Sequence, residues 1–458
     1  MKNSINKNLW IGIILILITS CKKDFLEVKP NKALLVPTTL SDFDALLDNN
    51  ASMNRSVYGP IVASDDLVAP DAAFNNASFT IKSAYSWGEI GYGGDLQVDW
   101  IYSYVQIFYS NIVLDGLEKI KENESIAYKN VKGSALFFRA FAASQLLMSY
   151  TLAYQKSTAL KELGIPILLT SDVNQKYSRG NLQQSYDQVI SDLKEASSLL
   201  TLTSSNAYRP NKAAAHGLLS RIYLSMGNYQ SALLEADNSL KLSSKLIDYT
   251  MLTLNPLTAT NPYPKIFPIN LNPEVLFHAG VGQPFVNAAT TAVNPEIVSA
   301  YANNDLRKAG MLYDRGGGLF TFKGRYSGST VYFSGVAVNE VLLTRAECLV
   351  RSNKPLEALA DLNSLLIYRY KTGAYQPYTI SNTPNVLKLI LAERRKELLF
   401  TGLRWLDLKR LNLEPDHAVT LTRTINGKTH VLLPNSNRYA FQIPDEEIIV
   451  SGIEQNLK

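Results

Sequence analysis

Apolar residues recur at intervals of three and four along most of this 458-residue chain, which is the spacing of amphipathic α-helices. This periodicity predicts helices over residues 128–150, 184–200, 212–226 and 229–240, with another beginning at Asp99. In the helix from Asp99, the predicted apolar face consists of Ile101, Tyr104, Val105, Phe108 and Ile112. A chain with this pattern is expected to be mainly α-helical.

Two stretches interrupt the helical pattern. Residues 49–95 and 252–336 are rich in Gly, Pro, Asn and aromatic residues, which favours loops in the first stretch and short strands with loops in the second. A short helix beginning at Ser41 precedes them, and helices follow over 338–370, over 385–411 and from Asp445. Long loops inside a compact domain are often functional, so a binding site is expected in these stretches.

One helix pair matches the tetratricopeptide pattern of small and large residues. The pair spans 212–240 and turns at Gly227-Asn228. A looser match lies at 338–370, much further along the chain than the 34-residue period of such repeats. The predicted fold is therefore a tetratricopeptide-containing helical scaffold with long irregular loop insertions and few short strands.

The N-terminus has the three parts of an export signal. Lys2 and Lys7 precede an apolar run at 9–18, and the string ILITSC ends at Cys21. The run is shorter than the roughly 20 residues that a membrane-spanning helix needs. Since ILITSC resembles a bacterial lipobox, Cys21 is the predicted lipidation site. We expect a signal peptide over 1–20 and a lipidated tether over 21–40.

Composition and motifs argue against several classes of function. With 45 basic and 40 acidic residues, the small positive charge does not indicate a nucleic-acid partner. Two cysteines and four scattered histidines predict neither a disulfide framework nor a metal site. Phosphate-binding, zinc-protease and nucleophile-elbow motifs do not occur, and no cofactor is predicted. The basic cluster over 394–410 alternates with acidic residues, which predicts ion pairs within the protein.

Aromatic residues in the irregular stretches are the main candidates for ligand binding. Trp87 is the first of them, because it lies outside any helical periodicity and sugar C–H faces stack on indole. Asp65 and Asp66 are candidates for hydrogen bonds to sugar hydroxyls. The predicted ligand-binding residues are Trp87, Tyr85, Asp65, Asp66, Tyr301 and Tyr332.

Two other classes of function stay open on the residues alone. A glycan hydrolase needs only two carboxylates, which Asp65 and Asp66 could supply. Side chains of adjacent residues usually diverge, however, so the sequence favours binding over catalysis. The second alternative is a tetratricopeptide lipoprotein that binds another protein.

Several motifs resemble those of the RagB/SusD-like nutrient-binding outer-membrane lipoproteins. They include Cys21, the FFRAF string around Arg139, and Gly164-Ile165-Pro166. The most specific are the closing stretches ERRKELLFTGLRWLDLKR and IPDEEI. A further helix pattern consists of Trp100, Tyr104, Ile107 and Asn111.

The resemblance implies a protein without enzymatic activity that captures nutrients at the outer membrane. It implies a lipid-anchored, outward-facing position and a SusC-like TonB-dependent transporter as partner, with an oligosaccharide or peptide as ligand. It also suggests a SusD-like helical region over 41–250 and a RagB/SusD region with the loop insertion over 251–458.

Overall fold

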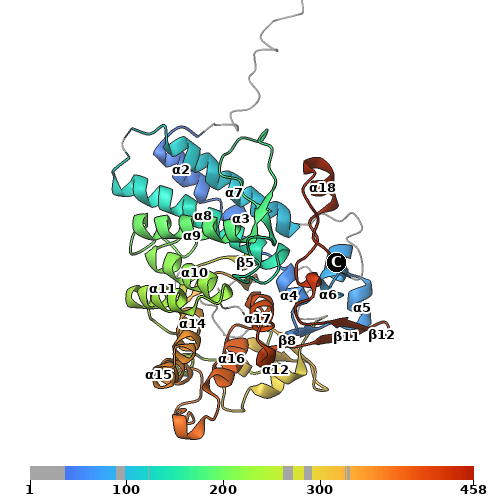
Figure 1. Ribbon diagram of the computed structural model, residues 1–458. Coiled ribbons are helices and arrows are strands. Elements are labelled where there is room, and N and C mark those ends of the chain that lie inside the picture. The colour runs from blue at the N-terminus through green and yellow to red at the C-terminus, as the bar shows by residue number, and fades with distance from the viewer. Residues whose placement is uncertain are drawn as a thin grey trace, which may run out of the picture. The chain divides into compact units, whose positions relative to one another are not determined.

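The computed structural model describes residues 37–88, 98–121, 123–260, 272–282, 291–324, 326 and 331–458 (Figure 1). The chain divides into two units, Met1–Thr39 and Leu40–Lys458, and every element below belongs to the second. The predicted signal peptide, Cys21 and most of the predicted tether lie outside the described residues.

Long helices form the scaffold, and neighbours along the chain lie side by side down one side of Figure 1. The mainly α-helical fold predicted from the periodicity is therefore confirmed. These helices are α7 (Val98–Leu117), α8 (Ile126–Tyr150), α9 (Leu182–Leu199), α10 (Lys212–Ser225), α11 (Tyr229–Leu242), α14 (Val338–Arg351) and α15 (Pro355–Leu366).

Helix α8 lies between α7 and α9 and is buried on nearly every face, because its sequence is apolar around most of the helix. Its residues Phe137, Phe138 and Phe141 are fully buried and surround the ring of Phe277, at centroid distances of 4.7, 5.6 and 5.1 Å. The helix begins where the Ser125 side chain accepts a hydrogen bond from the backbone N–H of Tyr128.

The buried face of α7 differs from the prediction. Ile101 is exposed and the other predicted apolar positions are only partly buried, whereas Ser103, Gln106, Ser110 and Asn111 are buried. The reason is hydrogen bonding, because these polar side chains bond to backbone oxygens, as Gln106 does to Arg55 at 2.9 Å. The prediction of this face was therefore wrong.

Residues 49–95 were expected to form loops, and in the described part this is wrong. Four short helices lie there, each too short to show a period in the sequence. Local residues define where some of these helices begin: Pro60 lies in the first turn of α4, and the Ser78 side chain caps α6. The four helices are α3 (Asn50–Met53), α4 (Gly59–Ala63), α5 (Asp71–Asn75) and α6 (Phe79–Tyr85), and α2 (Leu40–Leu47) precedes them.

The described strands form six antiparallel pairs, β1–β6, β2–β3, β4–β10, β5–β9, β7–β8 and β11–β12. The predicted short strands in the central stretch are thus confirmed. The strands are β1 (Leu67–Val68), β2 (Leu163–Pro166), β3 (Arg179–Asn181), β4 (Val275–Phe277), β5 (Gly280–Val281), β6 (Ala292–Val293), β7 (Leu312–Asp314), β8 (Phe320–Phe322), β9 (Tyr332–Phe333), β10 (Val336–Ala337), β11 (Leu421–Ile425) and β12 (Lys428–Leu432).

The helix predicted over 385–411 is broken in the middle. Phe400 and Gly402 have φ angles of 59° and 89°, in the left-handed region that an α-helix does not use. The remaining helices are α12 (Pro295–Ala300), α13 (Leu306–Met311), α16 (Val386–Glu397), α17 (Leu403–Leu411) and α18 (Asp445–Ser451), with 3₁₀ turns η2 (Tyr249–Met251), η4 (Ile380–Asn382), η5 (Pro415–His417) and η6 (Asn437–Tyr439).

The pairs α10–α11 and α14–α15 are helical hairpins that turn at Gly227 and Asn353, both with positive φ. Their assignment as tetratricopeptide units stays a prediction. Within the part of the chain that the structure describes, no helix has both the length and the apolar composition to cross a membrane.

Candidate functional site

Trp87 lies in the core and not at a groove. Its side chain is 1% exposed, and its indole Nε1 donates a hydrogen bond of 2.9 Å to the backbone oxygen of Ala63. The guanidinium of Arg423, from strand β11, lies 4.6 Å from the centre of the indole. The expectation that Trp87 faces a groove is therefore wrong, because a residue more than 300 positions away in the sequence covers it.

The three predicted tyrosines are buried as well. The Tyr85 hydroxyl accepts a hydrogen bond from the backbone N–H of Ala69, and the Tyr301 hydroxyl donates one of 2.7 Å to the backbone oxygen of Lys396. The ring of Tyr332 packs against Phe322 at a centroid distance of 5.0 Å. In the described structure, these rings are part of a core cluster and offer no face to a ligand.

Asp65 and Asp66 form ion pairs with helices α16 and α17. Asp65 pairs with Arg404 at 2.7 Å and Arg395 at 3.0 Å, and Asp66 pairs with Arg395 at 3.1 Å. Burial would raise the pKa of Asp65, but the two arginines bring it down to about 2. Burial raises the pKa of Asp66 to about 6. The two carboxylates therefore hold the fold together, and nothing in their contacts brings them to a ligand.

A different set of residues surrounds an open pocket of about 570 Å³, which we call the tyrosine pocket. It is formed by the end of α3, the start of α7, the segment before α10 and the segment between β4 and β5. None of the predicted site residues lines it. Its main side chains are Asn54, Arg55, Asp99, Tyr102, Tyr208 and His278.

Asn54 holds these segments together at the base of the pocket. Its side-chain Nδ2 donates hydrogen bonds to the backbone oxygens of Tyr208, at 2.9 Å, and His278, at 2.7 Å. The backbone N–H of Gly280 donates to the backbone oxygen of Asn54 at 2.9 Å. Because Asn54 is buried and bonded on several sides, the pocket is built before any ligand arrives.

Aromatic rings and polar atoms converge on the pocket. The rings of Tyr208 and His278 meet edge to face at 4.9 Å, and the guanidinium of Arg55 lies 3.9 Å from the centre of the Tyr102 ring. Both tyrosines are partly exposed, and neither hydroxyl has a hydrogen-bond partner among the described residues.

Two buried polar groups of the pocket also lack partners. His278 is 3% exposed, yet neither of its ring nitrogens is hydrogen-bonded within the described structure, and the same is true of the Asn54 Oδ1. These atoms are enclosed by protein and do not face the open pocket, and buried polar atoms of this kind are commonly bonded to enclosed water.

Burial shifts the pKa values of Asp99 and His278, which both line the pocket. Burial raises the pKa of Asp99 to about 7, although backbone N–H groups of Tyr58 and Gly59 donate to its carboxylate at 2.8 to 3.1 Å and oppose this shift. Burial lowers the pKa of His278 to about 4. At neutral pH the imidazole is therefore uncharged and has one donor and one acceptor nitrogen.

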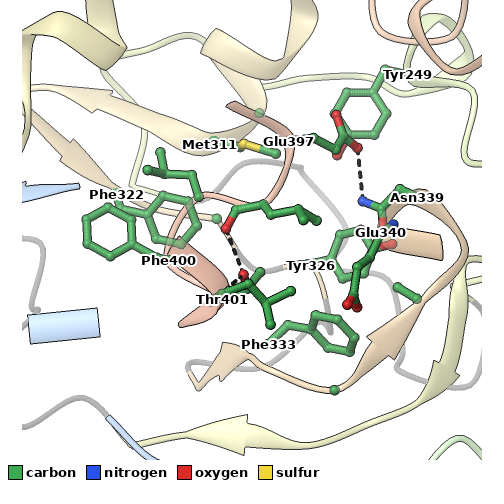
Figure 2. Close-up of a pocket in the computed structure, with 17 residues that line it drawn as sticks. Tyr249, Met311, Phe322, Tyr326, Phe333, Asn339, Glu340, Glu397, Phe400 and Thr401 are labelled. Atoms are coloured by element: carbon green, nitrogen blue, oxygen red, sulfur yellow. Dashed lines mark hydrogen bonds between the residues drawn. The ribbon is translucent and has the colours of Figure 1, made fainter. Parts of the chain in front are cut away.

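Other cavities of the described structure fit a ligand less well. The cavity between β8, β9 and residues 397–403 is lined by Phe322, Phe333 and Phe400 (Figure 2). Its volume of about 40 Å³ has room for a few water molecules but not for a sugar. A groove of about 670 Å³ runs beside α9, but Gln184 and Gln188 there are already bonded to Asn181 and Asp192.

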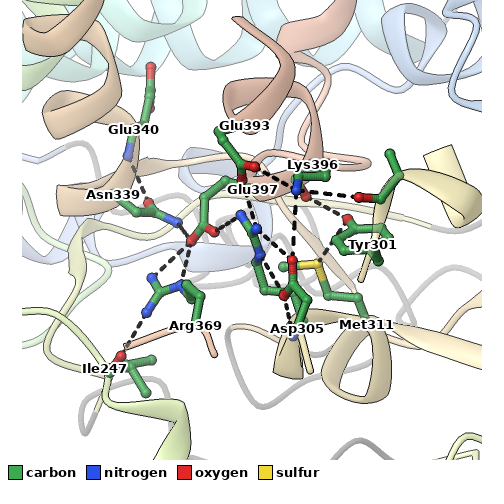
Figure 3. A network of polar contacts seen from close by, with 12 residues as sticks. Ile247, Tyr301, Asp305, Met311, Asn339, Glu340, Arg369, Glu393, Lys396 and Glu397 are labelled. Carbon is green, nitrogen blue, oxygen red and sulfur yellow. Dashed lines mark hydrogen bonds and ion pairs between the residues drawn. The ribbon is translucent and has the colours of Figure 1, made fainter. Parts of the chain in front are cut away.

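Charged residues of the family-like closing motif are buried in a network of ion pairs (Figure 3). Arg307 contacts Asp305 and Glu393, each at 2.7 Å, and Arg369 contacts Glu397 at 2.8 Å. Within the basic cluster itself, Asp407 contacts Arg394 at 2.9 Å and Arg410 at 2.8 Å, which confirms the prediction of ion pairs within the protein. The network joins α13, α16 and the segment after α15, so it has a structural role.

Sequence reasoning missed the pocket residues for identifiable reasons. Tyr102 lies inside the helical pattern of α7, and His278 is a single histidine in an apolar run. No local sequence pattern distinguishes these two residues from core residues. The pocket becomes visible only when the folded chain brings them together.

Family models match two parts of the chain. Residues 24–224 match a SusD-like family described as starch-binding and associating with the outer membrane, and residues 338–457 match the SusD family. A search of curated proteins found no match.

Solved structures share this fold over most of the chain. A SusD superfamily protein from Bacteroides thetaiotaomicron is 21% identical, with a TM-score of 0.72 over 92% of this chain and 100% of that one. A putative sugar binding protein from Bacteroides vulgatus is also 21% identical, with a TM-score of 0.71 over 92% and 99%. A SusD-like carbohydrate binding protein from Bacteroides vulgatus is 19% identical, with a TM-score of 0.68 over 91% and 97%.

Proposed function

Because the chain belongs to the SusD/RagB family, we propose that it is a cell-surface lipoprotein that binds an oligosaccharide in the tyrosine pocket. It then passes the sugar to a SusC-like TonB-dependent transporter in the outer membrane. Two structural neighbours are described as a sugar binding protein and a carbohydrate binding protein, which supports a sugar as the ligand.

One observation carries the assignment of the site. The tyrosine pocket combines the partly exposed rings of Tyr102 and Tyr208 with their hydroxyls, which have no hydrogen-bond partner among the described residues. Sugar rings need both features, because their C–H faces stack on aromatic rings while their hydroxyls require hydrogen bonds. Among the described lining residues, Asp99 supplies the single carboxylate, whereas glycoside hydrolysis uses a pair. The pocket therefore favours binding without cleavage.

Calorimetry with a panel of oligosaccharides and peptides tests this function on the chain from Lys22 onward. We expect binding of an oligosaccharide without release of reducing ends. Truncation of a central aromatic anchor typically costs about 2 kcal/mol, so Tyr208→Ala and Tyr102→Ala should each weaken binding about thirtyfold. Tyr368→Ala is the matched control, because this exposed tyrosine lies outside the pocket. Unchanged affinity in both pocket variants would show that the ligand binds elsewhere.

A separate experiment tests the transfer to a transporter. Membranes that contain a tagged form of the full chain are solubilised gently, and the tagged protein is recovered. We expect a large TonB-dependent β-barrel protein to co-purify with it. Recovery of the tagged protein without any such protein would contradict the transfer and leave the sugar site unaffected.

A further inference from the structure

Arg55 is held in place at the tyrosine pocket, yet no acidic side chain of the described residues forms an ion pair with it. Its Nε donates a hydrogen bond of 2.7 Å to the backbone oxygen of Ala51, and its guanidinium stacks on Tyr102 at 3.9 Å. Within the described part of the chain it forms no ion pair, and its two terminal amino groups have no hydrogen-bond partner. Neighbouring residues thus orient the guanidinium of Arg55, and its terminal N–H groups are available to bind a ligand.

Most other arginines of the described structure do pair with carboxylates. Arg139 contacts Asp192 at 2.7 Å, Arg221 contacts Glu340 at 2.6 Å, and Arg345 contacts Asp361 at 2.7 Å. Unlike these residues, Arg55 has no carboxylate of the described residues paired with its guanidinium. A guanidinium binds carboxylate, phosphate and sulfate groups through two parallel hydrogen bonds.

The one carboxylate among the described lining residues is engaged with the backbone. The oxygens of Asp99 accept hydrogen bonds from the N–H groups of Tyr58 and Gly59. Burial also raises the pKa of Asp99 to about 7, so its negative charge is incomplete at neutral pH. Asp99 therefore neither pairs with Arg55 nor gives the pocket a full negative charge.

We propose that the tyrosine pocket binds an acidic oligosaccharide, whose carboxylate or sulfate group forms two hydrogen bonds with Arg55. This inference rests on the proposed function and names the class of sugar that the same pocket takes. The rings of Tyr102 and Tyr208 then contact the sugar faces, while Arg55 selects the charged substituent.

Three sets of probes test the inference by calorimetry at low salt. They are galacturonate oligosaccharides, sulfated galactose oligosaccharides and neutral galactose oligosaccharides of matched length. We expect one of the acidic sets to bind at least tenfold more tightly than the neutral set, and this preference should shrink as sodium chloride is added. The set that binds more tightly identifies the group as a carboxylate or a sulfate.

Variants of Arg55 separate charge recognition from sugar binding. Arg55→Gln should reduce the ratio of acidic-probe to neutral-probe affinity at least tenfold, and Arg55→Lys should restore part of that ratio. Arg315→Gln is the matched control, because Arg315 also stacks on a tyrosine, Tyr313, at 4.3 Å but lies outside the pocket. Thermal melts of each variant show that the fold is intact.

The outcomes distinguish the two proposals. Equal binding of acidic and neutral probes, or an acidic preference that survives Arg55→Gln, would overturn the acidic-sugar inference and leave the sugar site standing. Failure of every oligosaccharide to bind would overturn the proposed function and this inference together.

Discussion

Arg423 shows how one buried cation determines the role of its neighbours. Its guanidinium lies 4.0 Å from the ring centre of Tyr85 and 4.6 Å from that of Trp87, and it donates hydrogen bonds to the backbone oxygens of Tyr85, Ala63 and Ser64. Burial lowers the pKa of Arg423 to about 10. The aromatic faces that would otherwise be open to a ligand are therefore occupied by the protein itself.

Trp87→Ala should destabilise the protein by about 3 to 5 kcal/mol, because it removes a fully buried indole and leaves a cavity beside Arg423. Chemical denaturation measures the change in the free energy of unfolding. Trp405→Ala, which also removes a buried indole, should cost a similar amount. Oligosaccharide binding by folded Trp87→Ala protein should stay close to wild type. A stable Trp87→Ala variant that no longer binds sugar would instead make Trp87 a binding residue.

His278 should make stability depend on pH. In the unfolded chain a histidine takes up its proton near pH 6.5, whereas burial delays protonation of folded His278 until about pH 4. Its contribution to stability is therefore present above pH 6.5 and is lost as the pH falls toward 4, by up to about 3 kcal/mol. Urea denaturation of wild type and His278→Gln at pH 4.5, 5.5 and 7 measures this. We expect the free energy of unfolding to depend less on pH in the variant. If it changes with pH equally in both proteins, His278 is not the source of the pH dependence.

At the scale of elements, ion pairs between helices align the scaffold. Arg139 of α8 pairs with Asp192 of α9 at 2.7 Å and donates a hydrogen bond of 3.0 Å to the Asn111 Oδ1 of α7. Asn111 in turn donates to the backbone oxygens of Leu168 and Thr170. Two of the family-like motif residues, Arg139 and Asn111, thus fix neighbouring helices and the segment after β2.

Arg139→Met should destabilise the protein by about 3 to 5 kcal/mol, because it leaves the buried carboxylate of Asp192 without its partner. Lys132→Met is a matched control, since Lys132 pairs with Glu195 across the same two helices but at an exposed position. That change should cost less than about 1 kcal/mol. Chemical denaturation measures the free energy of unfolding of both variants. Equal decreases would mean that burial does not determine the cost of breaking the ion pair.

At the scale of the whole molecule, contacts cross the boundary predicted near residue 250. Phe277 lies among three phenylalanines of α8, and Arg221 of α10 pairs with Glu340 of α14 at 2.6 Å. The tyrosine pocket also draws on both sides of this boundary, since Tyr208 and His278 both line it. Docking of the predicted regions against each other therefore creates the candidate site.

Cys21→Ala should release the protein from the membrane, because several acyl chains, each adding about 0.8 kcal/mol per buried methylene, hold the predicted lipoprotein there. The fold should be unchanged, since the unit from Leu40 to Lys458 contains all the described elements. Fractionation of cells and labelling with a fatty acid measure anchoring and acylation. A Cys21→Ala protein that stays in the membrane fraction at the wild-type level would contradict a lipid anchor at this residue.

The sequence by itself determined the features that depend on neighbours a few residues away. The helices from α8 to α11, the helix start at Asp445 and the ion-paired character of the basic cluster follow from periodicity, caps and alternating charge. The family-like motifs belong here too, because they consist of short strings with fixed spacing.

Only the tertiary structure decided which side chains are covered and which stay open. Trp87 is buried because β11 brings Arg423 over it. The buried face of α7 includes Gln106 and Asn111 because distant backbone oxygens accept their hydrogen bonds. The tyrosine pocket exists because segments far apart in the sequence meet there. The physical reason is that a local pattern defines a helix within a few turns, whereas burial depends on whatever the rest of the chain places against it.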